Sequence, residues 1–178
     1  MKRLIALAST LFITTLFGIA ITTVAADDQN ADVNAALASA LRLADLPLEQ
    51  GLEISSREGK AISAKYELED DDADELQLSI YIEPKDGRFA EVIIDYASGK
   101  IAKVTPITEG DDLAAAKSQS KVMAQAKRSL EAATAEAVRA QGEYRALSVI
   151  PDLRDGHPVA KVTLVNGTQW KTVLETLE

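Results

Sequence analysis

Apolar residues recur at helical spacing in two parts of the chain, and each part predicts a helix. The first spans residues 33–44, with Asp32 available as its N-cap and with Pro47 and Gly51 ending it. The second runs from Asp111 to Ala140 and ends at Gly142. Its apolar stripe is thin, which favours packing against a sheet over a coiled-coil dimer.

Between these helices the pattern changes to strict alternation, which is typical of half-buried antiparallel strands. Residues 61–69 and 76–83 each place their apolar side chains on one face. A hairpin at Asp86-Gly87 then leads into residues 89–104, where a strand ends in Asp95, turns and continues. We predict that Asp95 shapes this turn through hydrogen bonds to the backbone.

Three further strands follow the second helix, over residues 144–150, 158–165 and 168–177. Residues 152–157 form the first turn between them, and Asn166-Gly167 predicts a tight hairpin at the second.

The order helix, strands, helix, strands predicts an α+β fold in which helices cover antiparallel sheets. It also indicates an internal duplication, with a first unit over residues 27–110 and a second, diverged unit over residues 111–178. The pattern leaves open whether the two units form one domain or two.

The first 26 residues have the features of a secretory signal peptide. Lys2 and Arg3 precede a long apolar run, and Val24 and Ala26 fit the small-residue rule for a cleavage site after Ala26. The alternative is an uncleaved anchor, because the run is about as long as a membrane span. With cleavage, we expect a periplasmic or secreted protein that no longer contacts the membrane.

Charge and composition narrow the classes of partner. Residues 27–111 carry 20 acidic and 8 basic side chains, whereas residues 112–178 carry 8 and 9. Because residues 27–111 are this acidic, they repel phosphate backbones, which excludes nucleic acid as a partner. The chain contains no cysteine, so disulfides, thiolate nucleophiles and cysteine-bound metals are excluded.

The acidic run from Asp70 to Glu75 suggests a cation site. An EF-hand loop counted from Asp70 would need Gly at its sixth position and Glu at its twelfth, where the chain has Glu75 and Tyr81. The run therefore predicts a solvated hairpin loop, and a loose cation site at Asp70, Asp72 and Asp74 remains as the alternative.

Residues that could carry catalysis are few. His157 is the one histidine, and it lies in a predicted turn without a nucleophile elbow. We expect no catalytic, cofactor-binding or metal-binding residues, and therefore no enzyme. Trp170 is expected in the core, with an interface anchor as the alternative. Lys117, Lys121 and Arg128 form a basic stripe on the second predicted helix.

The segment "EVIIDYASGKIAKV" resembles the signature of the PepSY family, in which a strand ends in aspartate and a glycine turn leads into another apolar strand. The matching positions are Val92, Ile94, Asp95, Ser98, Gly99, Lys100 and Ile101. In the second unit Asp155-Gly156 matches the first turn, but Asn166-Gly167 replaces the longer motif. The resemblance covers nearly all of the chain after residue 26 and implies two tandem PepSY-like units.

PepSY units occur in the propeptides of metallopeptidases and in small exported bacterial proteins. The resemblance therefore implies a non-enzymatic protein that binds or modulates an extracytoplasmic protein such as a peptidase, by edge strands or a sheet face. The alternative is a periplasmic sensor or accessory module that responds to cations. The sequence does not determine the oligomeric state.

Overall fold

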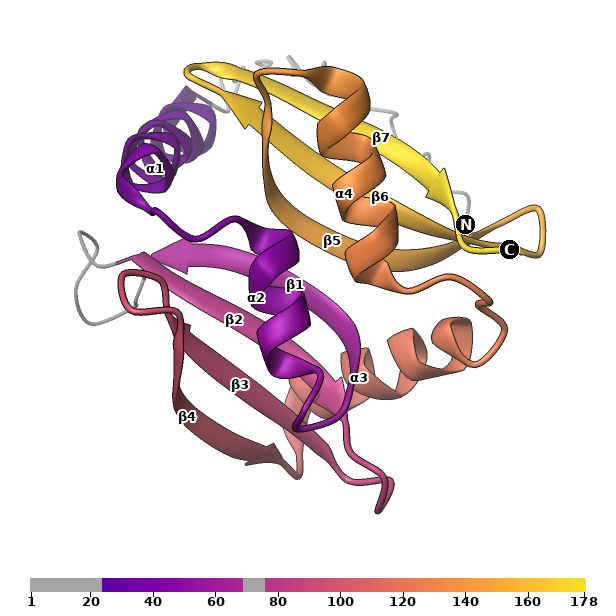
Figure 1. Ribbon diagram of the computed structural model, residues 1–178. Helices are drawn as coiled ribbons and strands as arrows, with labels where there is room; N and C mark the ends of the chain where they lie inside the picture. Colours follow the sequence, from indigo (N-terminus) through magenta and orange to yellow (C-terminus); the bar gives the residue numbers. More distant parts are fainter. Residues whose placement is uncertain (1–23, 69–75) are drawn as a thin grey trace, which may run out of the picture.

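The computed structural model describes residues 24–68 and 76–178, and it arranges them in helices and one antiparallel sheet (Figure 1). The elements in chain order are α1 (Val24–Leu43), α2 (Leu48–Ser55), β1 (Lys60–Leu68), β2 (Leu76–Glu83), β3 (Phe89–Asp95), β4 (Lys100–Ile107), α3 (Gly110–Met123), α4 (Leu130–Gln141), β5 (Arg145–Arg154), β6 (His157–Asn166) and β7 (Gln169–Thr176). This confirms the predicted α+β class.

The sheet has seven strands in the order β4-β3-β2-β1-β5-β6-β7. Neighbours within β1–β4 and within β5–β7 are also neighbours in sequence, so each group is a meander. The two groups meet at β1 and β5, whose ladder contains the pairs Ala64–Val149 and Lys65–Ser148. We call α1, α2 and β1–β4 the first half, and α3, α4 and β5–β7 the second half.

Helices cover both faces of the sheet. On one face, α2 packs against β1 and β2, and α4 packs against β5, β6 and β7, while α2 and α4 also contact each other (Figure 1). On the other face, α3 crosses β1 and β2: Ser63 donates a hydrogen bond to Gln119, and Tyr81 donates one to Asp112. Burial and the hydrogen bond to Asp112 raise the pKa of Tyr81.

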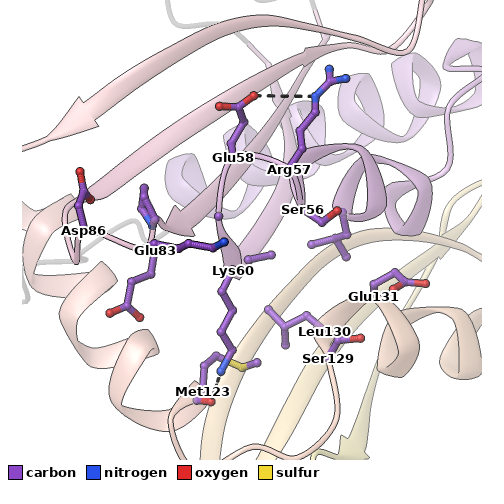
Figure 2. A pocket seen from close by; sticks show the side chains of 15 residues that line it. Ser56, Arg57, Glu58, Lys60, Glu83, Asp86, Met123, Ser129, Leu130 and Glu131 are labelled. Atoms are coloured by element: carbon purple, nitrogen blue, oxygen red, sulfur yellow. Dashed lines mark hydrogen bonds and ion pairs between the residues drawn. The ribbon is translucent and has the colours of Figure 1, made fainter.

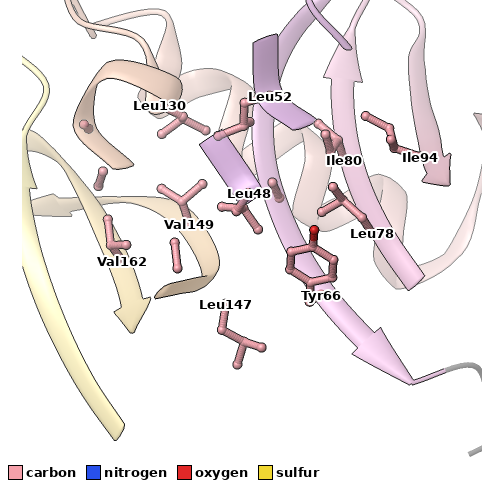
Figure 3. Close-up of a cluster of buried hydrophobic side chains, with 14 of the residues drawn as sticks. Leu48, Leu52, Tyr66, Leu78, Ile80, Ile94, Leu130, Leu147, Val149 and Val162 are labelled. Atoms are coloured by element: carbon pink, nitrogen blue, oxygen red, sulfur yellow. The ribbon is translucent and has the colours of Figure 1, made fainter. Parts of the chain in front are cut away.

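The buried apolar residues form one cluster that includes both halves. Figure 3 shows Leu52 of α2 next to Leu130 of α4, with Ile80 on one side and Val149 on the other. The face that alternation predicted for β2 is confirmed, since Leu76, Leu78, Ile80 and Ile82 are all buried. Among the described residues, every buried side-chain nitrogen or oxygen has a hydrogen-bond partner.

The predicted turns are confirmed, with two differences in position. The turn expected over residues 152–157 is only Asp155 and Gly156, because β5 continues to Arg154 and β6 begins at His157. The Asp95 carboxylate accepts hydrogen bonds from the backbone N–H groups of Ala97 and Ser98, at 3.0 and 2.8 Å. Gly99 follows with a φ of +65°, which favours glycine. The hairpin between β6 and β7 turns on Gly167 and Thr168 rather than on Asn166-Gly167, because Asn166 pairs with Gln169 and closes the turn.

The hydrogen bonds at Asp95 predict a pH dependence of stability. They lower the pKa of its carboxyl group below the ordinary value, chiefly through the bond from Ser98. A group whose pKa is lower in the folded state stabilises the fold above its unfolded pKa and loses this effect as pH falls through the folded pKa. We therefore expect wild type to melt at a higher temperature than Asp95→Asn at pH 7, with the difference closing below about pH 4.

Thermal melts across that pH range measure the effect. Asparagine keeps the side-chain oxygen that accepts the two bonds and removes only the charge. A difference in melting temperature that is the same at pH 7 and pH 3 would show that the charge of Asp95 does not stabilise the turn.

The first predicted helix differs from the structure at both ends. Asp32 is not its N-cap, because α1 begins at Val24, and the predicted cleavage site after Ala26 falls within α1. Pro47 does not end α1 but precedes α2 as its N-cap residue. Gly51 does not end a helix either. It lies inside α2, where a Cβ would come within 2.5 Å of Leu78 Cδ2, so glycine lets α2 approach β2 closely.

The predicted helix over residues 111–140 is two helices. The chain leaves helical geometry between α3 and α4, where the backbone N–H groups of Lys127 and Arg128 donate to the carbonyl of Leu177 at 2.7 and 3.0 Å. Ser129 then caps α4 by accepting from the Ala132 N–H at 3.1 Å. Bonds to the end of the chain thus replace helical bonds that the alanine-rich sequence would otherwise form.

Within the two described ranges, no helix is both long and apolar enough to cross a membrane.

Candidate functional site

A groove of about 770 Å³ lies where the two halves meet (Figure 2). Its walls come from the end of α2, the start of β1, the turn between β2 and β3, the end of α3 and the start of α4. We call it the junction groove. Its lining residues are Leu52, Ser56, Arg57, Glu58, Gly59, Lys60, Ala61, Glu83, Pro84, Lys85, Asp86, Met123, Ser129, Leu130 and Glu131.

The groove has an apolar floor. Leu52, Met123 and Leu130 line it and are each almost fully buried. They come from α2, α3 and α4 and belong to the core cluster. The floor therefore exists only where both halves pack together.

The wall at Gly59 depends on a close backbone approach. A Cβ on this residue would lie 2.9 Å from both the carbonyl oxygen of Glu83 and the nitrogen of Pro84. Both contacts are with backbone atoms, which cannot rotate away as a side chain would. Glycine thus allows the loop between α2 and β1 to lie against the end of β2.

Charged side chains on the groove wall form bonds that hold the wall together. Lys60 Nζ donates to the carbonyl of Met123 at 2.5 Å, where its positive charge also suits the C-terminal end of α3. Ser120 Oγ donates to Glu83 Oε2 at 2.6 Å. At the rim, Arg57 and Glu58 form an ion pair at 3.8 Å (Figure 2).

The turn between β2 and β3 forms one end of the rim. The guanidinium of Arg88 donates to the carboxylate of Asp86 at 2.6 and 2.9 Å, and the Arg88 backbone N–H adds a third bond. These bonds lower the pKa of Asp86 and raise the pKa of Arg88. The carboxylate therefore stays charged and fixed in the turn.

This arrangement suits recognition of a polypeptide segment. Apolar groups of the lining, including the half-buried Ala61 and Pro84 above the floor, can contact apolar groups of a ligand, and charges of both signs around the rim can orient it. The acidic and basic groups described above form bonds within the wall and the rim.

The groove gives a stability prediction. We expect Gly59→Ala to lower the free energy of unfolding by about 1–2 kcal/mol, the lower part of the range for overpacking, because the loop can shift only by moving away from β2. Denaturant unfolding monitored by Trp170 fluorescence measures this cost. Glu58→Ala, one residue earlier and exposed, is the control. Equal stability of the two variants would contradict the close approach.

The two outer strands of the sheet are a second feature that a partner can use, since each leaves one side of its backbone unpaired. β4 carries Lys100, Lys103 and Pro106. Lysine and proline are residue types that prevent an edge strand from pairing with a strand of another chain. β7 carries two exposed apolar residues, Trp170 at 37% and Leu174 at 49% exposed. The expectation that Trp170 lies in the core is wrong, because it lies on this edge strand.

The other residues that the sequence singled out are dispersed. His157 Nδ1 lies 2.7 Å from Glu178 Oε1 in an exposed hydrogen bond, which lowers the pKa of Glu178. Lys117 and Lys121 lie on α3, but Arg128 lies in the connection to α4, so they do not form one helical stripe. The acidic run from Asp70 to Glu75 lies outside the described residues.

Sequence patterns did not identify the junction groove, because its walls come from five separate segments. Gly59 was the available signal, but a glycine alone does not indicate what packs opposite it. Among the residues that the structure describes, no three His, Asp or Glu side chains gather in a way that could hold a metal ion.

Comparisons with models of known protein families, with curated proteins and with solved structures found no match to this chain.

Proposed function

We propose that this chain is an exported, non-catalytic protein that binds another protein through the junction groove, and that an extracytoplasmic peptidase is its partner. The observation that carries the proposal is the combination in one groove of an apolar floor with a rim of both charge signs. Export rests on the signal-peptide pattern of residues 1–26, and the choice of a peptidase rests on the PepSY resemblance.

The arrangement of elements supports two tandem PepSY-like units, over residues 27–110 and 111–178. Each contains two helices followed by a meander: α1, α2 and β1–β4, then α3, α4 and β5–β7. Their first strands, β1 and β5, pair antiparallel at the centre of the sheet. A two-fold relation between the units would produce such a pair, since it reverses one strand relative to the other.

The proposal places the binding site between the units rather than within either one. Both units contribute to the floor, Leu52 and Leu130 being on opposite sides of the junction (Figure 3). A single unit would therefore lack half of the site.

Capture from periplasmic extract tests the proposal when the captured proteins are assayed for peptidase activity with and without this protein. We expect the wild type to retain a peptidase and to change its rate. Reversing two rim charges in Arg57→Glu/Lys85→Glu should weaken capture by about tenfold, equivalent to about 1.4 kcal/mol over the two rim contacts.

The matched control is Lys103→Glu, which reverses a charge on β4 away from the groove lining. It should capture as wild type does. Absence of any captured peptidase would contradict the choice of partner, and equal capture by the rim variant and the control would contradict the choice of site.

A further inference from the structure

β7 is an edge strand with few of the features that prevent edge-to-edge pairing, since its one lysine, Lys171, donates to Gln141 Oε1 of α4. Its eight residues contain no proline, and they pair with β6 without a register shift from Asn166–Gln169 to Val159–Thr176. Exposed, regular edges of this kind are templates for a further strand.

The turn defines which backbone groups of β7 face outward. A two-residue hairpin makes its closing pair, Asn166 and Gln169, a hydrogen-bonded one. Pairs then alternate along an antiparallel ladder, so Trp170, Thr172, Leu174 and Thr176 have N–H and C=O groups directed away from β6. These residues also share one face of the sheet, because side chains alternate with a period of two.

The last of these positions is already covered. Arg128 Nη1 reaches the carbonyl of Thr176 at 3.5 Å, and its Nη1 also lies 3.8 Å from Glu175 Oε2. The backbone N–H groups at 127 and 128 bind Leu177. The contact of Arg128 with Thr176 agrees with an outward carbonyl there, and the free part of the edge is residues 170–174.

This free part is complementary to itself. When two copies of β7 run antiparallel with Thr172 opposite Thr172, Trp170 of each copy lies opposite Leu174 of the other. Directly opposite side chains in such a ladder are about 5 Å apart and in contact. On the other face, Lys171 lies opposite Val173 and Gln169 opposite Glu175, so no like charges meet.

The opposite edge of the sheet lacks these properties. β4 has Pro106 and two lysines, and its ladder with β3 contains a register shift at Ile93–Ile94. Lysines at an unpaired edge repel a second copy of the same edge. β7 is therefore the edge strand better suited to pair with a second copy of the chain.

We propose that β7 pairs with β7 of a second copy of this chain, antiparallel about a two-fold axis at Thr172, to form a homodimer with one continuous sheet. The proposal goes beyond the proposed function and does not depend on it, since the junction groove is lined by no residue of β7. The Trp170–Leu174 contact occurs twice and covers two apolar side chains that the single chain exposes.

Cross-linking tests the register directly, because the wild-type chain contains no cysteine. In Thr172→Cys the two new thiols would face each other across the axis, with Cα atoms about 5.5 Å apart, within the reach of a disulfide. We expect mild oxidation of the protein, produced from the full chain, to yield a covalent dimer. Leu174→Cys places its thiols four residues out of register and should yield little covalent dimer.

Sedimentation over a range of protein concentrations measures the association without a cross-link. Thr172→Pro removes an outward N–H of β7 and leaves the ladder with β6 intact, so it should weaken the dimer by about tenfold to a hundredfold, as two lost hydrogen bonds imply. Val104→Pro is the matched control. Its N–H on β4 also faces outward, because Val104 lies two residues from Pro106, which has no N–H to donate to β3. The dimer of this variant should match wild type.

Melting temperatures confirm that both proline variants are folded. A wild type that is monomeric at several hundred micromolar would overturn the proposal, as would equal cross-linking of the two cysteine variants. Loss of association in Val104→Pro but not in Thr172→Pro would assign the dimer to β4 instead. A monomer whose Trp170 fluorescence responds to an extended peptide would assign the β7 edge to a different partner.

Discussion

Leu130→Ala is expected to lower the free energy of unfolding by about 2–5 kcal/mol, the range for a leucine whose removal leaves a cavity in a core. Leu130 is 1% exposed and lies at the start of α4, where it meets α2 above the β1–β5 junction (Figure 3). The surrounding strands hold both helices in place, so the cavity cannot close completely. Denaturant unfolding followed by circular dichroism and by Trp170 fluorescence measures the loss.

The same experiment tests whether the two halves unfold together. Because the buried residues form one cluster, both signals should shift by the same amount in Leu130→Ala. Val104→Ala, which removes a side chain that is 44% exposed on β4, should leave stability nearly unchanged. Two separate transitions in the variant would show that the halves have independent cores.

Arg145→Ala is expected to lower the free energy of unfolding by at least about 2 kcal/mol, since hydrogen bonds from a charged donor contribute about 1.5–3 kcal/mol each. Arg145 lies at the start of β5 and donates to the carbonyls of Leu41 and Leu46, at 2.5 and 3.4 Å. It thereby attaches the end of α1, in the first half, to a strand of the second half. The Leu46 carbonyl also accepts from Tyr66, whose pKa burial raises.

A second measurement separates this attachment from general destabilisation. Without Arg145 the end of α1 loses its bonds to β5, so limited proteolysis should cut near residues 42–47 before the rest of the chain unfolds. Arg139→Ala is the control, because Arg139 is exposed on α4 and pairs with Glu136, three residues earlier on the same helix. Equal protection of residues 42–47 in both variants would contradict the role of Arg145.

Local patterns predicted the strands well and the helices less well. Alternation over residues 76–83 identifies both the strand and its buried face, because every second side chain enters the same core. The turn at Asp95 could also be predicted, since its hydrogen bonds join residues two and three positions apart. Features that depend only on near neighbours in sequence are therefore accessible from the sequence alone.

Features that depend on distant parts of the chain were not predicted. The break between α3 and α4 is stabilised by the carbonyl of Leu177, some 50 residues away, and nothing within residues 124–128 indicates it. The junction groove likewise needs the packing of α2 on α4. Trp170 was expected inside because large aromatic residues are usually buried, but its place on an edge strand leaves it 37% exposed.

The β1–β5 junction also has a consequence for the order of folding. Every other ladder of the sheet joins strands that are consecutive in the chain, so those ladders close short loops and can form early. Pairing Ala64 with Val149 closes a loop of about 85 residues and has the largest entropic cost. We expect the two meanders to form first and the junction to limit the rate. Newly made chains would therefore acquire the groove only in the last step, after the second half has been synthesised.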